Sequence, residues 1–105
     1  MCFDPSFNDG HLICTFTGKL NANCISKIED EVFRNTERAD IVVFDLSKVD
    51  YISSQFLRMC LIVAKDKKMN NFSIINVGKE ASKVFKISGL YELLKINKKD
   101  IKNDE

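Results

Sequence analysis

Hydrophobic and polar positions along the chain follow two different periods, which predicts alternating strands and helices. Every second residue between His11 and Thr17 is apolar (Leu12, Cys14, Phe16), as in a strand with one buried face, and Gly18 is predicted to end it. Ile41–Leu46 and Phe72–Val77 are almost continuously apolar over the length of a strand. Such runs are typical of strands covered on both faces, as in parallel sheets.

Two further strand predictions concern the ends of the chain. Residues 1–7 are expected to form an edge strand, because Pro5 cannot donate a hydrogen bond inside a sheet. Asn8-Asp9-Gly10 is a turn signal typical of a hairpin. Near the other end, the apolar segment from Leu90 to Ile96 is either a helical turn leading into a short strand or a single helix. Residues 97–105 are polar and predicted to fray.

Three helices are predicted between these strands. The first begins at Asn21 or Asn23 and carries an apolar stripe at helical spacing: Ile25, Ile28, Val32 and Phe33. The second runs from Ser54 to about Met69 and is apolar nearly all round in its middle, so much of it should be buried. A short third helix is expected to end at Gly89, in the position that glycine favours after a helix.

This order of elements predicts a single α/β domain over residues 1–105, with its core at about residues 8–96. Strands and helices alternate after an initial hairpin. That pattern favours a mixed, largely parallel sheet of four to five strands with helices packed against it. We find no internal repeat or linker in the sequence.

Charge and composition exclude several classes of function. With 16 Lys and Arg against 15 Asp and Glu, the net charge is +1, which gives no basic surface for direct binding of nucleic acid. No stretch approaches the ~18 apolar residues of a membrane helix, so no membrane insertion is expected. Residues 1–5 lack the features of a signal peptide, which points to a cytoplasmic protein.

The reactive side chains predict neither a metal, a cofactor nor an enzymatic site. The single histidine, His11, has no partner at ligand spacing. The four cysteines share no CxxC spacing, and Cys14 and Cys60 lie in apolar runs, typical of buried thiols in a reducing compartment. A Ser-His-Asp arrangement, a P-loop and a carboxylate pair are all missing, so we expect no catalysis.

The stretch Val49–Arg58 is the most informative about function, because it places two adjacent serines in the loop between a predicted strand and the start of a predicted helix. Unpaired N–H groups at a helix start favour a capping hydroxyl or a negative charge. Ser53 and Ser54 are therefore either helix caps or, at Ser54, a site for a phosphate. Arg58 lies one turn further on and either pairs with that phosphate or is simply solvated. Asp45 either supports the loop by hydrogen bonds to backbone N–H groups or lies near the phosphate.

Three segments resemble the sulfate transporter and anti-sigma factor antagonist (STAS) domain family. Phe44–Ser54 is similar to the family's "DLS-x-V-x-x-I-D/S-S" signature. Ile74–Val77 is similar to its penultimate strand, and Val84–Leu90 to its "V-x-x-x-x-x-G-L" ending. The segments occur in the family's order and spacing. The resemblance covers roughly residues 8–96 and implies a STAS-like fold.

The resemblance also implies a mechanism and a set of partners. The serine that a partner anti-sigma kinase phosphorylates in antagonists of this family matches Ser54. The unphosphorylated protein would bind an anti-sigma factor that is also a serine kinase of the histidine-kinase-like ATPase type. Phosphorylation would break that complex, and a phosphatase would reset it. The residues expected to bind the partner are Asn21, Ser53, Ser54, Gln55, Phe56 and Arg58, with Asp45 as structural support.

Two departures from the family pattern keep other functions open. Gln55-Phe56 stands where the family usually has Gly or Ala-Gly, and Asn21 where well-studied antagonists carry Asp. Phe56 either contacts the partner or turns into the core. The alternative function is a STAS interaction module that is not phosphorylated, within a transport or signalling complex. A nucleotide-binding regulator is a further alternative, although no Gly-rich phosphate loop is present.

Overall fold

A five-stranded sheet in the order β1-β2-β3-β4-β5 forms the centre of the molecule. The computed structural model describes residues 2–68, 70–91, 94 and 96–98. β1 pairs with β2 antiparallel, and the other neighbouring strands are parallel, which confirms the predicted mixed, largely parallel sheet. The elements in chain order are β1 (Phe3–Asn8), β2 (His11–Leu20), α1 (Ala22–Glu37), β3 (Ile41–Ile52), α2 (Ser54–Asp66), β4 (Phe72–Val77), α3 (Lys79–Ile87) and β5 (Ile96–Lys98).

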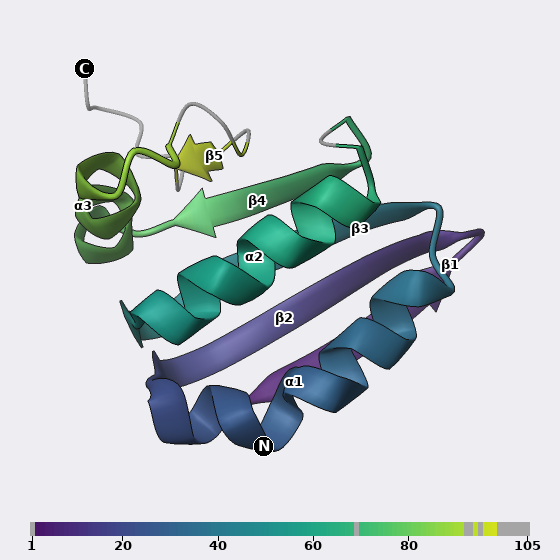
Figure 1. Cartoon of the computed structure of the whole chain (residues 1–105), viewed down its shortest axis with the longest axis horizontal. Helices are drawn as coiled ribbons and strands as arrows, with labels where there is room; N and C mark the ends of the chain where they lie inside the picture. Colours follow the sequence, from purple (N-terminus) through teal and green to yellow (C-terminus); the bar gives the residue numbers. More distant parts are fainter. Residues whose placement is uncertain (1, 69, 92–93, 95, 99–105) are drawn as a thin grey trace.

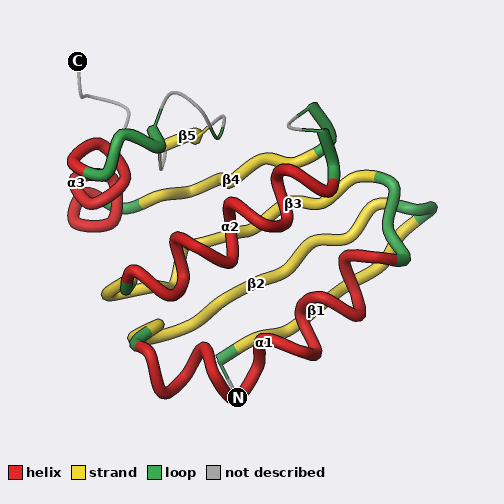
Figure 2. The backbone as a smooth tube through the Cα atoms, in the orientation of Figure 1, coloured by secondary structure: helices red, strands yellow, loops and turns green. Residues whose placement is uncertain are grey.

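The helices are arranged so that their starts gather at one edge of the sheet. α1 and α2 lie side by side on one face, and α3 follows the carboxyl end of β4 (Figure 1). β2, β3 and β4 are parallel, so their carboxyl ends point to the same edge (Figure 2). Each of these strands is followed almost at once by a helix. The first turns of α1 and α2, with the two serines, therefore lie together at this edge.

The core between the sheet and the helices is dominated by phenylalanine rings. Phe16 of β2 contacts Phe44 of β3 and Phe56 of α2, with ring centroids 4.9 and 5.3 Å apart. Phe44 in turn meets Phe72 of β4 at 4.9 Å. The apolar stripe predicted on the first helix faces the same core, with Ile25, Ile28 and Val32 buried. Rings from three strands and one helix thus hold α2 against the sheet.

Two strands are longer than the sequence pattern predicts. β2 does not end at Gly18 but continues to Leu20, and β3 does not end at Leu46 but continues to Ile52. Gly18 adopts a backbone φ of +84°, a conformation that glycine enters freely, and the pairing of β2 with β3 shifts register there. The irregularity shifts the pairing without ending it, so Leu20 still pairs with Ile52.

The helix ends and the last strand refine the remaining predictions. Asn21, one of the two predicted caps, begins α1. α2 ends at Asp66, earlier than predicted, and Met69 lies outside the described residues. For the segment from Leu90 to Ile96, the structure shows a turn that leads into the short strand β5, and not a single helix. Residues 97 and 98 belong to β5, whereas 99–105 lie outside the described residues.

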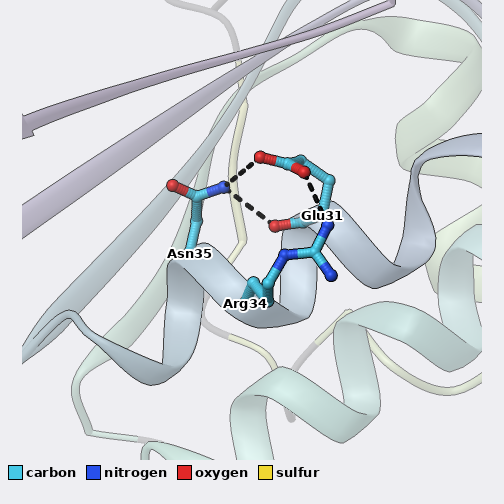
Figure 3. Close-up of polar contacts among 3 residues, drawn as sticks. All are labelled: Glu31, Arg34 and Asn35. Atoms are coloured by element: carbon cyan, nitrogen blue, oxygen red, sulfur yellow. Dashed lines mark hydrogen bonds and ion pairs between the residues drawn. The ribbon is translucent and has the colours of Figure 1, made fainter.

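A polar cluster near the end of α1 completes the fold without belonging to the serine site. Asn35 is buried, and its Nδ2 donates hydrogen bonds to the Glu31 carbonyl and carboxylate at 2.8 and 3.4 Å (Figure 3). Arg34 donates to the same carboxylate at 2.8 Å and lowers the pKa of Glu31. The Glu31–Arg34 pair is exposed, so it adds little stability. The cluster satisfies a buried amide more than three turns from the start of α1.

Candidate functional site

The two adjacent serines occupy different environments. Ser53 is the N-cap of α2 and is buried, with 7% of its surface exposed. Its Oγ accepts a hydrogen bond from the Phe56 N–H at 3.3 Å and donates one to the Leu20 carbonyl at 2.7 Å. Ser54 is the first residue of α2, and its side chain is exposed to solvent. The structural hydroxyl and the accessible hydroxyl are therefore on separate residues.

The Ser53 hydroxyl joins the starts of α1 and α2. Leu20, which accepts its hydrogen bond, is the last residue of β2. Asn21 follows at once and caps α1, because its Oδ1 accepts a hydrogen bond from the Cys24 N–H at 2.9 Å. The exposed Asn21 is thus held beside the loop that carries Ser53 and Ser54.

We expect Ser53→Ala to lower the free energy of unfolding by about 1–3 kcal/mol, because it removes a helix cap and leaves the buried Leu20 carbonyl without its donor. Urea denaturation followed by circular dichroism would measure the loss. Ser54→Ala is the matched control, and it should change stability by no more than about 0.5 kcal/mol, since Ser54 is exposed. Equal losses from the two substitutions would contradict this division of roles.

The exposed side chains after Ser54 border a small groove between α1 and α2. Ser54 Oγ lies 3.4 Å from Gln55 Oε1, a long and weak contact. Gln55 and Arg58 line a hollow of about 60 Å³ together with side chains of α1, and we call this hollow the α1–α2 groove. Its lining residues are Ala22, Ile25, Ser26, Glu29, Gln55 and Arg58.

Arg58 is the cation of this groove. It is four residues after Ser54, so both side chains project from the same face of α2. Its guanidinium is exposed, and within the described part of the chain it makes no hydrogen bond or ion pair. It is therefore available to an anionic group on Ser54 or on a partner.

Phe56 turns into the core, which is one of its two predicted positions. Its side chain is 0% exposed, and its ring contacts Phe16 and Phe44. This placement removes Phe56 from the accessible partner-binding set predicted from the sequence. Ser53 is buried as well and acts through the position of the loop. Asn21, Ser54, Gln55 and Arg58 remain as the exposed members.

Asp45 supports the sheet beneath the site. Its Oδ1 accepts hydrogen bonds from the Ser47 N–H at 2.9 Å and from Asn76 Nδ2 at 3.2 Å. Partial burial acts to raise the pKa of this carboxyl, but the bonds from Ser47 and Asn76 and the charge of Lys48 outweigh it and hold the pKa below its ordinary value. Asp45 thus joins β3 to the end of β4, and its hydrogen-bond partners, Ser47 and Asn76, do not include either serine of the site.

Sequence reasoning missed the α1 side of the groove and the partner of Asp45. Ala22, Ser26 and Glu29 recur with Ile25 at spacings of three and four, the signal of a shared helix face, but only Ile25 is strongly apolar. Asn76 has a backbone φ of +56°, which turns the end of β4 so that its amide reaches Asp45. An asparagine at the end of an apolar strand run was the available signal.

The described residues contain neither a membrane-spanning helix nor a cluster of metal-binding side chains. No helix in that part of the chain is long and apolar enough to cross a membrane. The same residues contain no group of three or more His, Cys, Asp or Glu side chains placed to hold a metal ion.

Comparison with known proteins agrees with this architecture. The STAS domain family model matches residues 3–101. BtrV of Bordetella bronchiseptica, whose name proposes an anti-sigma factor antagonist, is 31% identical over 91 residues, which cover 84% of this chain and 78% of BtrV.

Solved structures support the same fold. An anti-sigma factor antagonist (STAS) domain protein from Planctomyces limnophilus superposes with a TM-score of 0.82 at 15% identity, covering 91% of this chain and 89% of its own. Unphosphorylated SpoIIAA, an anti-sigma factor antagonist, has a TM-score of 0.76 at 13% identity, and the match covers 90% of this chain and 86% of SpoIIAA. The phosphorylated form of SpoIIAA from Bacillus has a TM-score of 0.69 at 13% identity, and the match covers 90% of this chain and 89% of SpoIIAA. On the family match and the relative in Bordetella bronchiseptica, this chain belongs to the STAS domain family and is of the anti-sigma factor antagonist-like kind.

Proposed function

We propose that this protein is an anti-sigma factor antagonist that binds an anti-sigma factor with serine-kinase activity and is switched by phosphorylation of Ser54. The observation that carries the proposal is the exposed Ser54 hydroxyl beside the buried Ser53 cap. A kinase can reach Ser54, while the hydrogen bonds that hold the loop belong to Ser53.

The position of Ser54 explains how one modification can act on binding without unfolding the domain. A phosphate adds about −1.5 to −2 charges and three acceptor oxygens. At the start of α2 the helix dipole favours that charge, and Arg58 stands one turn away to pair with it. A partner covering this surface would have to remove water from the phosphate, which opposes binding.

The proposed contact surface consists of Asn21, Ser54, Gln55 and Arg58, with the α1–α2 groove beside them. The kinase would be of the histidine-kinase-like ATPase type, and a phosphatase would restore the unmodified serine. In this proposal the protein catalyses no reaction itself and works in the cytoplasm. SpoIIAA, which shares the fold, has been solved with and without its phosphate, so the fold is compatible with both states.

Incubation with ATP and each candidate anti-sigma kinase from the source genome, followed by intact-mass spectrometry, tests the proposal. We expect a single added phosphate that maps to Ser54 and is absent from Ser54→Ala. The Ser53→Ala variant should still accept the phosphate at Ser54, provided that its circular dichroism spectrum shows that it is folded. Absence of phosphate with every candidate, or its placement at another serine, would reject Ser54 as the switch.

Gln55 favours the second candidate function, a STAS interaction module that is not phosphorylated. Its exposed amide oxygen lies 3.4 Å from Ser54 Oγ and stands where the family usually has a small residue. A bulky neighbour narrows access to the hydroxyl from one side. Co-purification with a membrane transport complex, in place of a kinase, would support this alternative.

A further inference from the structure

Two cysteines lie against each other at the side of α1 that faces away from the serines. The sulfur atoms of Cys2 and Cys24 are in bonding contact, although 22 positions separate them in the sequence. Both side chains are half-buried. Their Cα atoms are 7.4 Å apart, slightly beyond the range usual for disulfides. Cys2 directly precedes the edge strand β1, and its carbonyl accepts a hydrogen bond from the Thr17 N–H of β2 at 2.9 Å.

A helix start and two lysine side chains surround this pair. Cys24 lies in the first turn of α1, where the helix dipole stabilises a negative charge. Lys19 and Lys27 line the same cavity as the two cysteines, and its volume is about 590 Å³. Reactive cysteines are typically found at helix starts and near basic side chains. Because both cysteines are half-buried and line this cavity, a small oxidant is expected to approach them from it.

The other two cysteines provide an internal contrast. Cys14 and Cys60 are both 0% exposed. Burial raises the pKa of Cys14 to about 12 and that of Cys60 well above its ordinary value. These two thiols therefore stay protonated and inert, so any oxidation of the folded protein is directed to Cys2 and Cys24.

We propose that Cys2 and Cys24 form a reversible redox site that reacts with peroxide. The Cys24 thiolate attacks one peroxide oxygen, the O–O bond breaks, and hydroxide leaves to take up a proton as water. The Cys2 thiol then loses its proton and attacks the Cys24 sulfenic acid, forming the S–S bond and releasing a second water. A dithiol reductant reverses the oxidation by thiol–disulfide exchange.

The bond would couple redox state to the groove on the other side of α1. Cys24 is in the same helical turn as Ala22 and Ile25, which line the α1–α2 groove with Gln55. Oxidation ties this turn to β1, and reduction releases it. A disulfide in a reducing compartment is typically transient and redox-sensing, which fits a pair of this kind.

Treatment of the fully reduced protein with hydrogen peroxide, followed by alkylation under denaturing conditions and peptide mapping, tests the site. We expect loss of two hydrogen atoms, a crosslink between the peptides of Cys2 and Cys24, and full alkylation of Cys14 and Cys60. Dithiothreitol should restore all four thiols. The oxidised form should unfold about 10 °C higher than the reduced form, because the crosslink restricts the unfolded chain.

Single substitutions separate the roles of the two sulfurs. Cys2→Ser should leave a sulfenic acid at Cys24 that dimedone traps, whereas Cys24→Ser should form neither product. Lys27→Gln should slow the reaction, and Lys65→Gln, an exposed lysine on α2, should not. Oxidation that falls mainly on Cys14 or Cys60, or that yields only crosslinks between molecules, would overturn the proposal. So would a folded protein with no crosslink between Cys2 and Cys24.

Discussion

We expect Ser54→Asp to weaken binding of the cognate anti-sigma factor by at least about tenfold, and Ser54→Ala to bind it whether or not ATP is present. The partner would have to remove water from the new carboxylate and from the Arg58 guanidinium beside it, and burial of such charges costs more than the 1.4 kcal/mol or so that corresponds to tenfold. The alanine removes the only hydroxyl that the proposed kinase modifies, so ATP should no longer dissociate that complex. Titration calorimetry with and without ATP measures both effects.

The control for Ser54→Asp is Ser6→Asp, which adds the same charge at an exposed serine of β1. It should bind like the parent protein, because β1 is separated from α2 by β2 and α1 (Figure 1). If Ser54→Asp and Ser54→Ala both bind like the parent, the proposed switch is wrong and the interaction module becomes the better description.

The second large effect is expected from Phe56→Ala, which should lower the free energy of unfolding by about 3–5 kcal/mol. The Phe56 ring is fully buried, 5.3 Å from the Phe16 ring and 6.1 Å from the Phe44 ring. Its removal leaves a cavity where α2 meets the sheet. Such a loss is a large share of the 5–15 kcal/mol or so that stabilises a typical domain. Denaturant unfolding, with the slope m compared between variants, measures it.

Phe7→Ala is the control of matched residue type. The Phe7 side chain is 40% exposed and packs beneath the Arg38 guanidinium, 5.0 Å from the ring centre. Its loss should cost about 1 kcal/mol, from a cation–π contact and partial burial. A smaller loss from Phe56→Ala than from Phe7→Ala would show that Phe56 is not a core residue and would return it to the partner surface.

The sequence predicts the elements well where local periodicity determines burial. The stripe of Ile25, Ile28 and Val32 fixes the face of α1, because residues at these spacings necessarily share one side of a helix. The continuous run Ile41–Leu46 likewise identifies a strand, although its predicted coverage on both faces is not what the structure shows. Val42, Phe44 and Leu46 are buried, whereas the residues between them are only half-buried, because α1 and α2 cover one face of the sheet (Figure 1). Both patterns depend only on neighbours along the chain.

Strand ends were harder to predict because they depend on partners. β3 continues past Leu46 through polar residues such as Lys48 and Asp50, which local preference places in a loop. Pairing with the extended end of β2 holds this segment in the sheet. Its register depends on the irregularity at Gly18, a feature that a glycine in the sequence does not by itself distinguish from the end of a strand.

In the candidate site, too, local features could be predicted from the sequence and long-range contacts could not. A helix start with two hydroxyls is visible in the sequence, and the resemblance to the family pointed to Ser54. The hydrogen bond between Ser53 and Leu20 joins residues 33 positions apart, and the Asp45–Asn76 bond joins residues 31 apart. No local pattern encodes such contacts. The phosphoacceptor role of Ser54 and its partner contacts stay predictions until the experiments above are done.

The separation of Ser53 from Ser54 has an evolutionary consequence. The buried side chain at position 53 caps α2, so loss of the cap is expected to be selected against, whereas the Asp that the family signature also allows there could still accept the Phe56 N–H hydrogen bond. Position 54 makes no comparable contribution to the fold. A lineage can therefore gain, lose or replace a side chain at position 54 in a single mutational step, and its regulation can diverge while its architecture is inherited unchanged.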